Sequence, residues 1–330
     1  MTGDAMGAAT AFVELLGDRE RVLGPDHPET LIAYANAARW RGEAGDVAEA
    51  ATATAGLLND MRRVMGPDHP HTLATRASLA HYWGEAGDAA GAAAACAELL
   101  VDMRRVLGGD HPDVLAARSQ HARWQGEAGD AAGAVTALEG LLVDMQRVLS
   151  PDHPHILTAR SHHARWQGEV GDVAGAAAAC AELLDGLRRV LGPDDPDTLA
   201  TRGNLARWWG EAGDAARAAR AFAALLDDMW RVLGPDHPHT LTARSNLAYW
   251  RGVAGDAIGA ATAFDELLGD RERVLGPDHP DTLATRGNLA RWWGEAGDAE
   301  RAVTALDGLL DALGPDHPDT LAILDGLADW

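Results

Sequence analysis

The sequence contains no lysine, so all 28 of its basic residues are arginine. We interpret this absence as the codon usage of a GC-rich bacterium rather than as a functional feature. Positive charge is also outweighed by the 50 acidic residues, which gives a formal net charge of −22 at pH 7. Because such a charge repels phosphate, it excludes a general nucleic-acid-binding protein.

Cysteines and long apolar stretches are equally scarce. The two cysteines, Cys96 and Cys180, stand far apart in the sequence, and we expect them to lie beyond disulfide reach and to fit a reducing compartment. The longest apolar runs, such as residues 92–97, are short and rich in alanine, so no membrane-spanning segment is expected. The N-terminus has neither a basic start nor an apolar signal core, and we therefore expect a cytoplasmic protein.

The signatures of catalysis are missing as well. There is no phosphate-binding loop, no nucleophile elbow and no dinucleotide-binding fingerprint. No His-x-x-x-His or Cys-x-x-Cys spacing supports a zinc site. Carboxylates such as Glu211 and Asp214 recur at regular intervals, which is typical of solvated, capped turns. We therefore expect no enzyme activity, no cofactor and no metal.

What the sequence does contain is the pentapeptide Gly-Pro-Asp-His-Pro, which recurs at a fixed interval. Full copies begin at Gly24, Gly66, Gly234, Gly276 and Gly314, and degenerate copies begin at Gly108, Ser150 and Gly192. The interval between successive copies is constant until the last one, which is shorter. A period of about 42 residues predicts stacked units in a solenoid, and we expect one solenoid to run from the first residue of the chain to the last.

Each repeat is predicted to form two helices, here called A and B. In one repeat, Pro196 stands in the first turn of an expected A helix over residues 196–211. Gly213 then permits a positive φ that ends the A helix, and Asp214 is placed to cap a B helix over about 215–233. The chain is predicted to open with a B helix at about 4–23 and continue with seven A–B pairs from about 28 to 313. An A helix at about 318–330 closes it, and the last B helix is four residues short.

Two features of the repeat predict structural roles. Seven of the 14 histidines stand in the Asp-His-Pro turn, and Asp195 replaces the histidine of one copy, so we expect a capping role rather than a metal or catalytic one. One position of each A helix and one of each B helix is alanine in every copy, as at Ala206 and Ala218. We predict that these two columns touch, because small residues let helices approach closely.

The residues Asn204-Leu205-Ala206, Trp209, Gly213-Asp214, Ala218, Phe222 and Leu225 resemble the tetratricopeptide repeat. Together with the Gly-Pro-Asp-His-Pro turn, they resemble its 42-residue form in kinesin light chains and many bacterial regulators. The resemblance covers essentially the whole chain. It implies an all-α, right-handed superhelical solenoid of antiparallel helix pairs whose inner A-helix surface binds peptides.

One sector of the A helix is predicted to face a concave groove. On a helical wheel Ala200, Asn204, Arg207 and Glu211 share this sector, opposite Leu205 and the side that faces helix B. The asparagine column carries amides for an extended backbone, and the arginine column suits carboxylates. The candidate partner-binding residues are Asn36, Arg39, Gln120, Arg123, His162, Arg165, Asn204, Arg207, Asn246, Asn288 and Arg291. The alternative is that they are merely solvated residues of the inner face.

An aromatic residue occupies another A-helix position in every repeat. The column comprises Trp40, Tyr82, Trp124, Trp166, Trp208, Trp250, Trp292 and Trp330. Such a stripe could stack ligands, but we favour a role in filling the seam between successive repeats, because each unit must bury a face on its neighbour.

The function predicted from these features is a scaffold or sensor that recognises a protein or peptide through the A-helix groove. The arginine column favours acidic peptides or a free C-terminal carboxylate, whereas the net charge opposes long-range attraction of anions. One alternative is a homo-oligomer that stacks end to end through repeat-like ends. Another is the repeat region of a larger bacterial regulatory ATPase. No nucleic acid or membrane is expected as a partner.

Overall fold

The structure, a computed structural model, describes residues 15–43 and 45–313 of the 330-residue chain. Every regular element in these ranges is an α-helix, which confirms the predicted all-α class there. The predicted opening helix falls partly, and the closing helix at 318–330 wholly, outside the described residues. The contacts divide the chain into two compact units, unit 1 (Met1–Gly171) and unit 2 (Asp172–Trp330). That these form one continuous solenoid over residues 1–330 stays a prediction.

Helices A and B alternate in both units. After a helical stretch at 15–23, unit 1 has the A helices α2 (Pro28–Glu43), α4 (Pro70–Glu85), α6 (Pro112–Glu127) and α8 (Pro154–Glu169) and the B helices α3 (Val47–Val64), α5 (Ala89–Leu107) and α7 (Ala131–Val148). Unit 2 has the A helices α10 (Pro196–Glu211), α12 (Pro238–Val253) and α14 (Pro280–Glu295) and the B helices α9 (Val173–Val190), α11 (Ala215–Val232), α13 (Ala257–Leu275) and α15 (Ala299–Leu313). The last described residue is Leu313, where α15 ends, so the predicted shortening of the last B helix stays a prediction.

The start of each A helix is fixed by a side chain in the repeated turn. In α12, Nδ1 of His237 accepts a hydrogen bond from the backbone N–H of His239 at 3.2 Å. In α10, Oδ1 of Asp195 accepts the equivalent bond from Asp197 at 2.9 Å. Because an imidazole nitrogen and a carboxylate oxygen both supply this acceptor, the exchange at Asp195 is tolerated. The predicted capping role is confirmed for the six turn histidines that the structure describes, and His317 lies outside the described residues.

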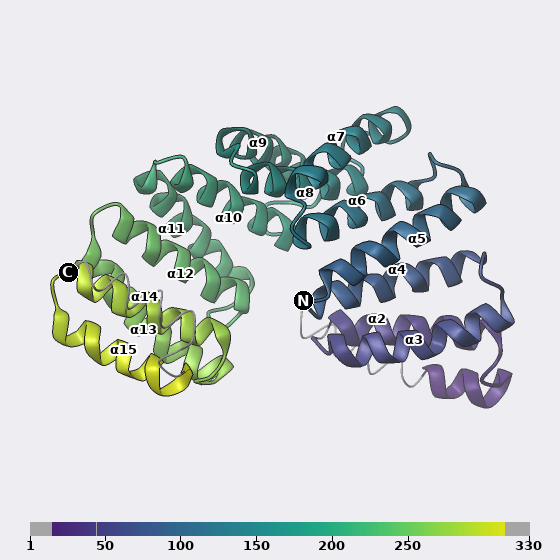
Figure 1. The fold of residues 1–330 in the computed structure, drawn as a ribbon, viewed down its shortest axis with the longest axis horizontal. Helices are drawn as coiled ribbons and strands as arrows, with labels where there is room; N and C mark the ends of the chain where they lie inside the picture. The colour runs from purple at the N-terminus through teal and green to yellow at the C-terminus, as the bar shows by residue number, and fades with distance from the viewer. Residues whose placement is uncertain (1–14, 44, 314–330) are drawn as a thin grey trace. The chain divides into compact units, whose positions relative to one another are not determined.

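The A helices form one face of each unit, and the B helices form the other. Each helix packs on the next one in sequence within its unit, and Figure 1 shows the antiparallel hairpins that result. Successive A helices also contact each other, as α4 contacts α6 and α10 contacts α12, whereas among the described helices successive B helices do not. Because the A helices lie closer together, the A face is the inner side of each stack.

The aromatic column fills the seam between successive repeats. A Cβ on Gly210 would lie 2.6 Å from Trp250 of the next A helix, and a Cβ on Gly252 would lie 2.5 Å from Trp292. The ring therefore lies flat against backbone that only glycine leaves open. Trp250 and Trp292 are 6% and 4% exposed, so most of each ring is buried, and the predicted seam is confirmed within the units. Trp330 lies outside the described residues.

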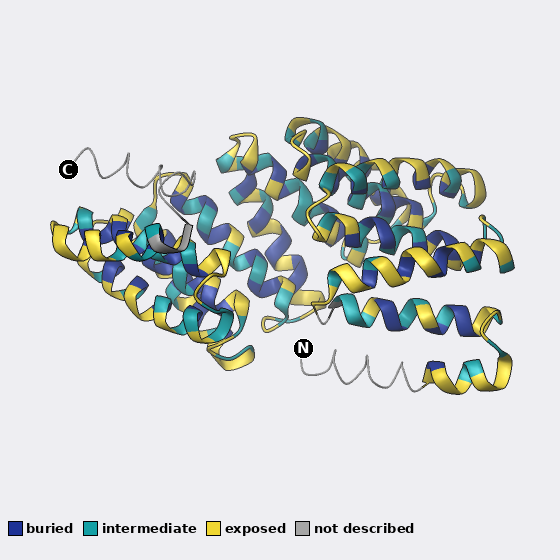
Figure 2. Ribbon diagram, turned by 60° about the horizontal axis from the view of Figure 1, so that its bottom comes forward, coloured by how far each residue is buried: buried dark blue, intermediate teal, exposed yellow. Residues whose placement is uncertain are grey.

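In four of the described repeats the two alanine columns lie in the same core cluster, as predicted. Ala206 and Ala218 are fully buried members of one core cluster, and Ala122 and Ala134 are members of another. Figure 2 shows the buried residues on the sides of the helices that face their neighbours. The core therefore runs along each unit as a series of linked clusters, as expected when each repeat buries its surface on the next.

An arginine on the side of the A helix that faces helix B forms an ion pair with that helix. The guanidinium of Arg202 donates to Asp228 of α11 at 2.8 Å, with the side chain 18% exposed. Asp228 also pairs with Arg231, which binds Asp194 of the preceding turn at 2.6 Å. The same links recur at Arg76–Asp102, Arg118–Asp144 and Arg244–Asp270. These ion pairs tie helix A to helix B within a repeat.

Candidate functional site

The predicted groove sector lines two cavities on the A face of unit 2. The first, about 400 Å³, lies between α10 and α12 over α11; Ala200, Asn204, Arg207 and Asn246 line it. Phe222, Leu225 and Met229 of α11 line the same cavity. Because the A helices contact each other along this face, successive repeats place their asparagines side by side. Three residues of the predicted sector of α10, Ala200, Asn204 and Arg207, therefore line this cavity.

The second cavity, about 460 Å³, is centred on α12. Glu211 and Arg207 of α10, Asn246 and Tyr249 of α12, and Asn288 of α14 contribute to it. Phe264 of α13 and Trp250 supply apolar surface. A cavity with a few polar groups and an apolar lining is the usual form of a ligand site. The two cavities are thus lined by four candidate residues, Asn204, Arg207, Asn246 and Asn288. A fifth, Arg291, lines neither cavity, but its guanidinium lies 5.7 Å from the ring of Tyr249, which lines the second.

The asparagine side chains in these cavities keep hydrogen-bonding capacity. Asn288 donates one bond, to the carbonyl of Ala284 on its own helix at 3.0 Å. Asn204 is exposed and Asn246 is half-buried, and neither side chain hydrogen-bonds to another described residue. An amide offers two donors and an acceptor with two lone pairs, so this row can pair with the backbone of an extended peptide.

The arginines of the predicted groove make more contacts within the protein than the sequence suggests. Each arginine lies over the tryptophan that follows it, as Arg207 does over Trp208 at 3.9 Å and Arg123 over Trp124 at 4.2 Å. Arg123 also binds Glu85 of the preceding A helix at 2.7 Å. Cation–π stacking and this charge pair hold the guanidinium over the seam. A ligand carboxylate at Arg123 would therefore compete with Glu85.

The candidate residues of unit 1 occupy a different environment. Nδ1 of His162 on α8 lies 3.1 Å from Oγ of the buried Ser119 on α6. Burial, together with Arg123 and Arg165, lowers the pKa of His162 to about 4, so the imidazole is neutral at pH 7. Gln120 has a buried side-chain oxygen without a partner among the described residues. In unit 1, the side chains of Gln120 and His162 are therefore at least partly buried between helices rather than open to a groove.

The two remaining arginines of the candidate site in unit 1 also lie over the tryptophan that follows them. Arg165 pairs with Glu127 at 2.7 Å and lies over Trp166 at 4.7 Å. Arg39 lies over Trp40 at 5.3 Å, and Asn36, one helical turn earlier, is half-buried. None of these residues lines either of the two cavities described above. The candidate residues that line these two cavities belong to unit 2.

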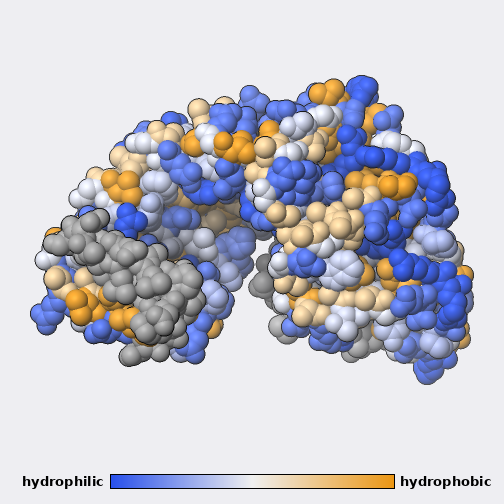
Figure 3. All heavy atoms as spheres, in the orientation of Figure 1, coloured by the Kyte–Doolittle hydropathy of each residue, from blue (hydrophilic) through white to orange (hydrophobic). Residues whose placement is uncertain are grey.

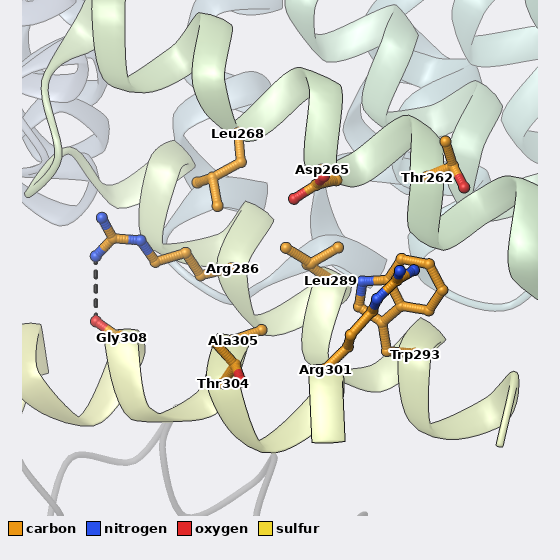
Figure 4. Close-up of a pocket in the computed structure, with 10 residues that line it drawn as sticks. All are labelled: Thr262, Asp265, Leu268, Arg286, Leu289, Trp293, Arg301, Thr304, Ala305 and Gly308. Carbon is orange, nitrogen blue, oxygen red and sulfur yellow. Dashed lines mark hydrogen bonds between the residues drawn. The ribbon is translucent and has the colours of Figure 1, made fainter. Parts of the chain in front are cut away.

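Another cavity of unit 2, about 760 Å³, lies among α13, α14 and α15 (Figure 4). Arg301 lies over the ring of Trp293 at 4.4 Å, and Arg286 donates to the carbonyl of Gly308 at 3.1 Å. Arg286 also binds Glu272 at 2.7 Å. None of the predicted groove residues lines this cavity. Its arginines are engaged in contacts within the protein.

Other kinds of site find no support in the part of the chain that the structure describes. Among residues 15–43 and 45–313, no three His, Cys, Asp or Glu side chains gather in a geometry that would hold a metal ion. No described helix has the length and apolarity needed to cross a bilayer. On the face shown in Figure 3, hydrophobic residues of the described part are interspersed with hydrophilic ones. Cys96 and Cys180 are buried and free, and burial raises the pKa of each thiol to about 11.

Sequence reasoning missed the pairing between A-helix arginines and glutamates of the preceding repeat. Arg123 binds Glu85 of the repeat before it, and Arg165 binds Glu127 in the same way. The signal was present, because both columns are regular, but Glu211 and its equivalents were interpreted as solvated turn residues. Phe264, which lines the second cavity from a B helix, was also missed.

Comparisons with known proteins agree with the fold. The sequence profile of the tetratricopeptide repeat matches residues 72–113, 198–239 and 240–281. A search of curated protein sequences gives no match. The three matched segments are therefore tetratricopeptide repeats, and together they cover less than half of the chain. Such a solenoid is a scaffold suited to protein–protein interaction.

Several solved structures share this fold. The nearly identical repeats of a kinesin light chain from Podosopora anserina are 22% identical, with a TM-score of 0.55, over 63% of this chain and 99% of that one. BtubC (BKLC) from P. vanneervenii is 20% identical, with a TM-score of 0.56, over 68% and 92%. A signal-transduction ATPase with a tetratricopeptide repeat sensor, from Pyrococcus horikoshii, is 12% identical, with a TM-score of 0.60, over 98% and 50%. At these identities the likeness concerns the fold alone.

Proposed function

We propose that the protein recognises an extended peptide or a protein segment in the A-helix groove of unit 2. The observation that supports this most directly is the pair of adjacent cavities lined by Asn204, Asn246 and Asn288. Their amides repeat along the groove and can bond to successive peptide groups of a ligand. The apolar surface of Phe222 and Phe264 below them would take up side chains of the same segment.

The ligand would be held mainly by the amide row. In unit 1, Arg123 and Arg165 already bind Glu85 and Glu127, so their charges are offset within the protein. An acidic partner, or one with a free C-terminal carboxylate, would therefore have to compete with Glu85 and Glu127 for these arginines in unit 1. In this proposal the protein is a scaffold or sensor without chemistry of its own, and its partner is a protein in the cytoplasm.

A comparative pull-down tests the proposal. The baits are the native chain, the groove variant Asn204→Ala/Asn246→Ala/Asn288→Ala, and Asn59→Ala as control, since Asn59 is exposed on the B helix α3. Proteins retained by the native chain are identified by mass spectrometry and titrated as purified partners. Each of the three lost amide bonds is expected to cost about 0.5–1.5 kcal/mol, so the groove variant should bind at least about 10-fold more weakly.

The outcomes separate the alternatives. A purified partner that binds the native chain and Asn59→Ala equally, but the groove variant weakly, supports groove recognition. Equal binding by all three baits contradicts it. If the native bait captures only further copies of itself, the end-to-end homo-oligomer takes its place, and light scattering as a function of concentration would confirm that assembly.

A further inference from the structure

The glutamate-to-arginine pairs that connect successive A helices are interrupted on both sides of α12. In unit 1 the arginine of one A helix binds the glutamate of the A helix before it, at 2.7 Å for both Arg123–Glu85 and Arg165–Glu127. The helix α12 carries Tyr249 where this pattern has arginine, and Val253 where it has glutamate. At these two positions α12 therefore has no cation to pair with Glu211 of α10 and no anion to pair with Arg291 of α14.

The interruption leaves one carboxylate and one guanidinium without their usual partners. Glu211 of α10 has its one ion pair among the described residues with Arg207 on its own helix, at 3.7 Å. That separation is longer than the 2.7 Å of the unit 1 pairs. Arg291 of α14 has no carboxylate within ion-pair distance among the described residues. Its guanidinium instead lies 5.7 Å from the ring of Tyr249 and 5.1 Å from that of Trp292.

These charges lie beside a cavity that has room for a ligand. Glu211, Asn246, Tyr249 and Asn288 line the 460 Å³ cavity, and Arg291 follows Asn288 by one turn of α14. The Tyr249 ring lies against Arg291 at the side of this cavity. Val253 itself is 45% exposed, so a longer side chain at this position would extend into solvent.

We propose that the groove at α12 selects a peptide segment that carries both a carboxylate and a cation, the carboxylate bound by Arg291 and the cation by Glu211. The tyrosine ring lies between the two contacts, and Asn246 and Asn288 hold the backbone. This assignment rests on the proposed function, because it needs a peptide in the groove. Arginine suits the carboxylate because its fork of donors matches two oxygens. Interruption of the internal pairs would thus make α12 the specificity-determining helix.

The experiment restores the missing partner. Val253→Glu supplies Arg291 with an internal carboxylate, as Glu85 does for Arg123, and Val253→Ala is the matched control without charge. A phage-displayed library of random dodecapeptides is selected on the native chain, on both variants and on the groove variant Asn204→Ala/Asn246→Ala/Asn288→Ala. The best peptide from the native chain is then titrated by fluorescence anisotropy, together with its Glu→Gln or Asp→Asn analogue. Thermal unfolding verifies that each variant is folded.

We expect the native chain and Val253→Ala to enrich peptides that contain an acidic and a basic residue. Val253→Glu should lose the acidic preference and bind the best peptide about 2–5-fold more weakly, since a competing internal pair replaces one exposed charge contact. The uncharged analogue should bind the native chain and Val253→Glu equally. In the same way, Tyr249→Arg should remove the preference for the basic residue.

The two proposals fail in distinguishable ways. If the groove variant loses the peptides while Val253→Glu and Val253→Ala select and bind the same acidic ones, Arg291 does not hold the carboxylate, and only the inference about α12 is overturned. If the native chain enriches no peptide, or the groove variant selects the same peptides as the native chain, peptide recognition in the groove is refuted and the inference with it.

Discussion

Trp250 lies flat against the backbone of Gly210 in the preceding A helix, so closely that a Cβ on the glycine would be 2.6 Å from the ring. The same contact joins Trp124 to Gly84 and Trp292 to Gly252. The seam thus depends on a large ring in one repeat and on the absence of a side chain in the repeat before it. Neither residue alone explains the close stacking of repeats.

Gly210→Ala is therefore expected to destabilise the protein, although alanine normally favours a helix. Overpacking against Trp250 should cost about 1–3 kcal/mol of the free energy of unfolding, measured by urea denaturation and circular dichroism. The control is Gly269→Ala on α13, where a Cβ meets nothing within 4 Å; it should gain up to about 1 kcal/mol. If both variants raise the free energy of unfolding, the packing of Trp250 adjusts to the added methyl group without a loss of stability.

The ion pairs between helices A and B should contribute unequally to the free energy of unfolding. Asp228 receives hydrogen bonds from Arg202 and Arg231, and these hold the pKa of its carboxyl below the usual range. Because Arg202 is 18% exposed, Asp228→Asn should cost about 1–2 kcal/mol. Asp194→Asn removes only an exposed pair with Arg231 and should leave the urea midpoint almost unchanged. Equal losses would contradict this ranking.

The architecture could be predicted from the sequence because its signals are local. Proline and glycine positions fix the helix ends, and the predicted A helix over 196–211 agrees with α10 at both ends. The role of His237 follows from the exchange to Asp195, since both supply an acceptor. The aromatic column could be assigned to the seam because each repeat must bury a face.

The candidate site was predictable only in part. A helical wheel identifies the sector that faces the groove, as at Asn204 and Asn246, but it does not show which charges are already paired. Arg123 binds a glutamate of another repeat, and His162 turns to Ser119 of a neighbouring helix. Both contacts depend on the distance between stacked helices, which the period of the sequence does not specify. Whether the groove binds a partner stays a prediction.

His162 should make the protein sensitive to acid. Its pKa in the folded state is about 4, below the usual value of 6.5, so the unfolded chain takes up the proton first as the pH falls. The associated stability is present above pH 6.5 and is lost between pH 6.5 and 4. The difference between the two pKa values corresponds to about 3 kcal/mol.

His162→Asn, which introduces the asparagine found at position 204, is expected to remove this component. Urea denaturation at pH 7.5 and pH 4.5 measures the free energy of unfolding of both proteins. The native chain should lose about 2–3 kcal/mol more than the variant on going to the lower pH. An identical loss in both proteins would mean that His162 titrates normally in the folded state.

Arg271 on α13 occupies a position that is methionine in other repeats, as at Met145 and Met229. It is 4% exposed and donates to the carbonyl of Asp281 at 2.8 Å and to the hydroxyl of Thr285 at 2.6 Å. No carboxylate binds it among the described residues, its Nε lacks a partner there, and burial lowers the pKa of its guanidinium. A buried cation of this kind is costly to desolvate.

Arg271→Met is therefore expected to raise the free energy of unfolding by about 1–2 kcal/mol, since the thioether fills a similar volume without a charge. Thr285 keeps its own bond to the carbonyl of Asp281 at 2.7 Å, so that acceptor stays satisfied. The control is Arg273→Met, which breaks the exposed pairs with Asp236 and Asp270 and should bring no gain. If Arg271→Met instead lowers the urea midpoint, the two hydrogen bonds from Arg271 to α14 outweigh the cost of burying its charge.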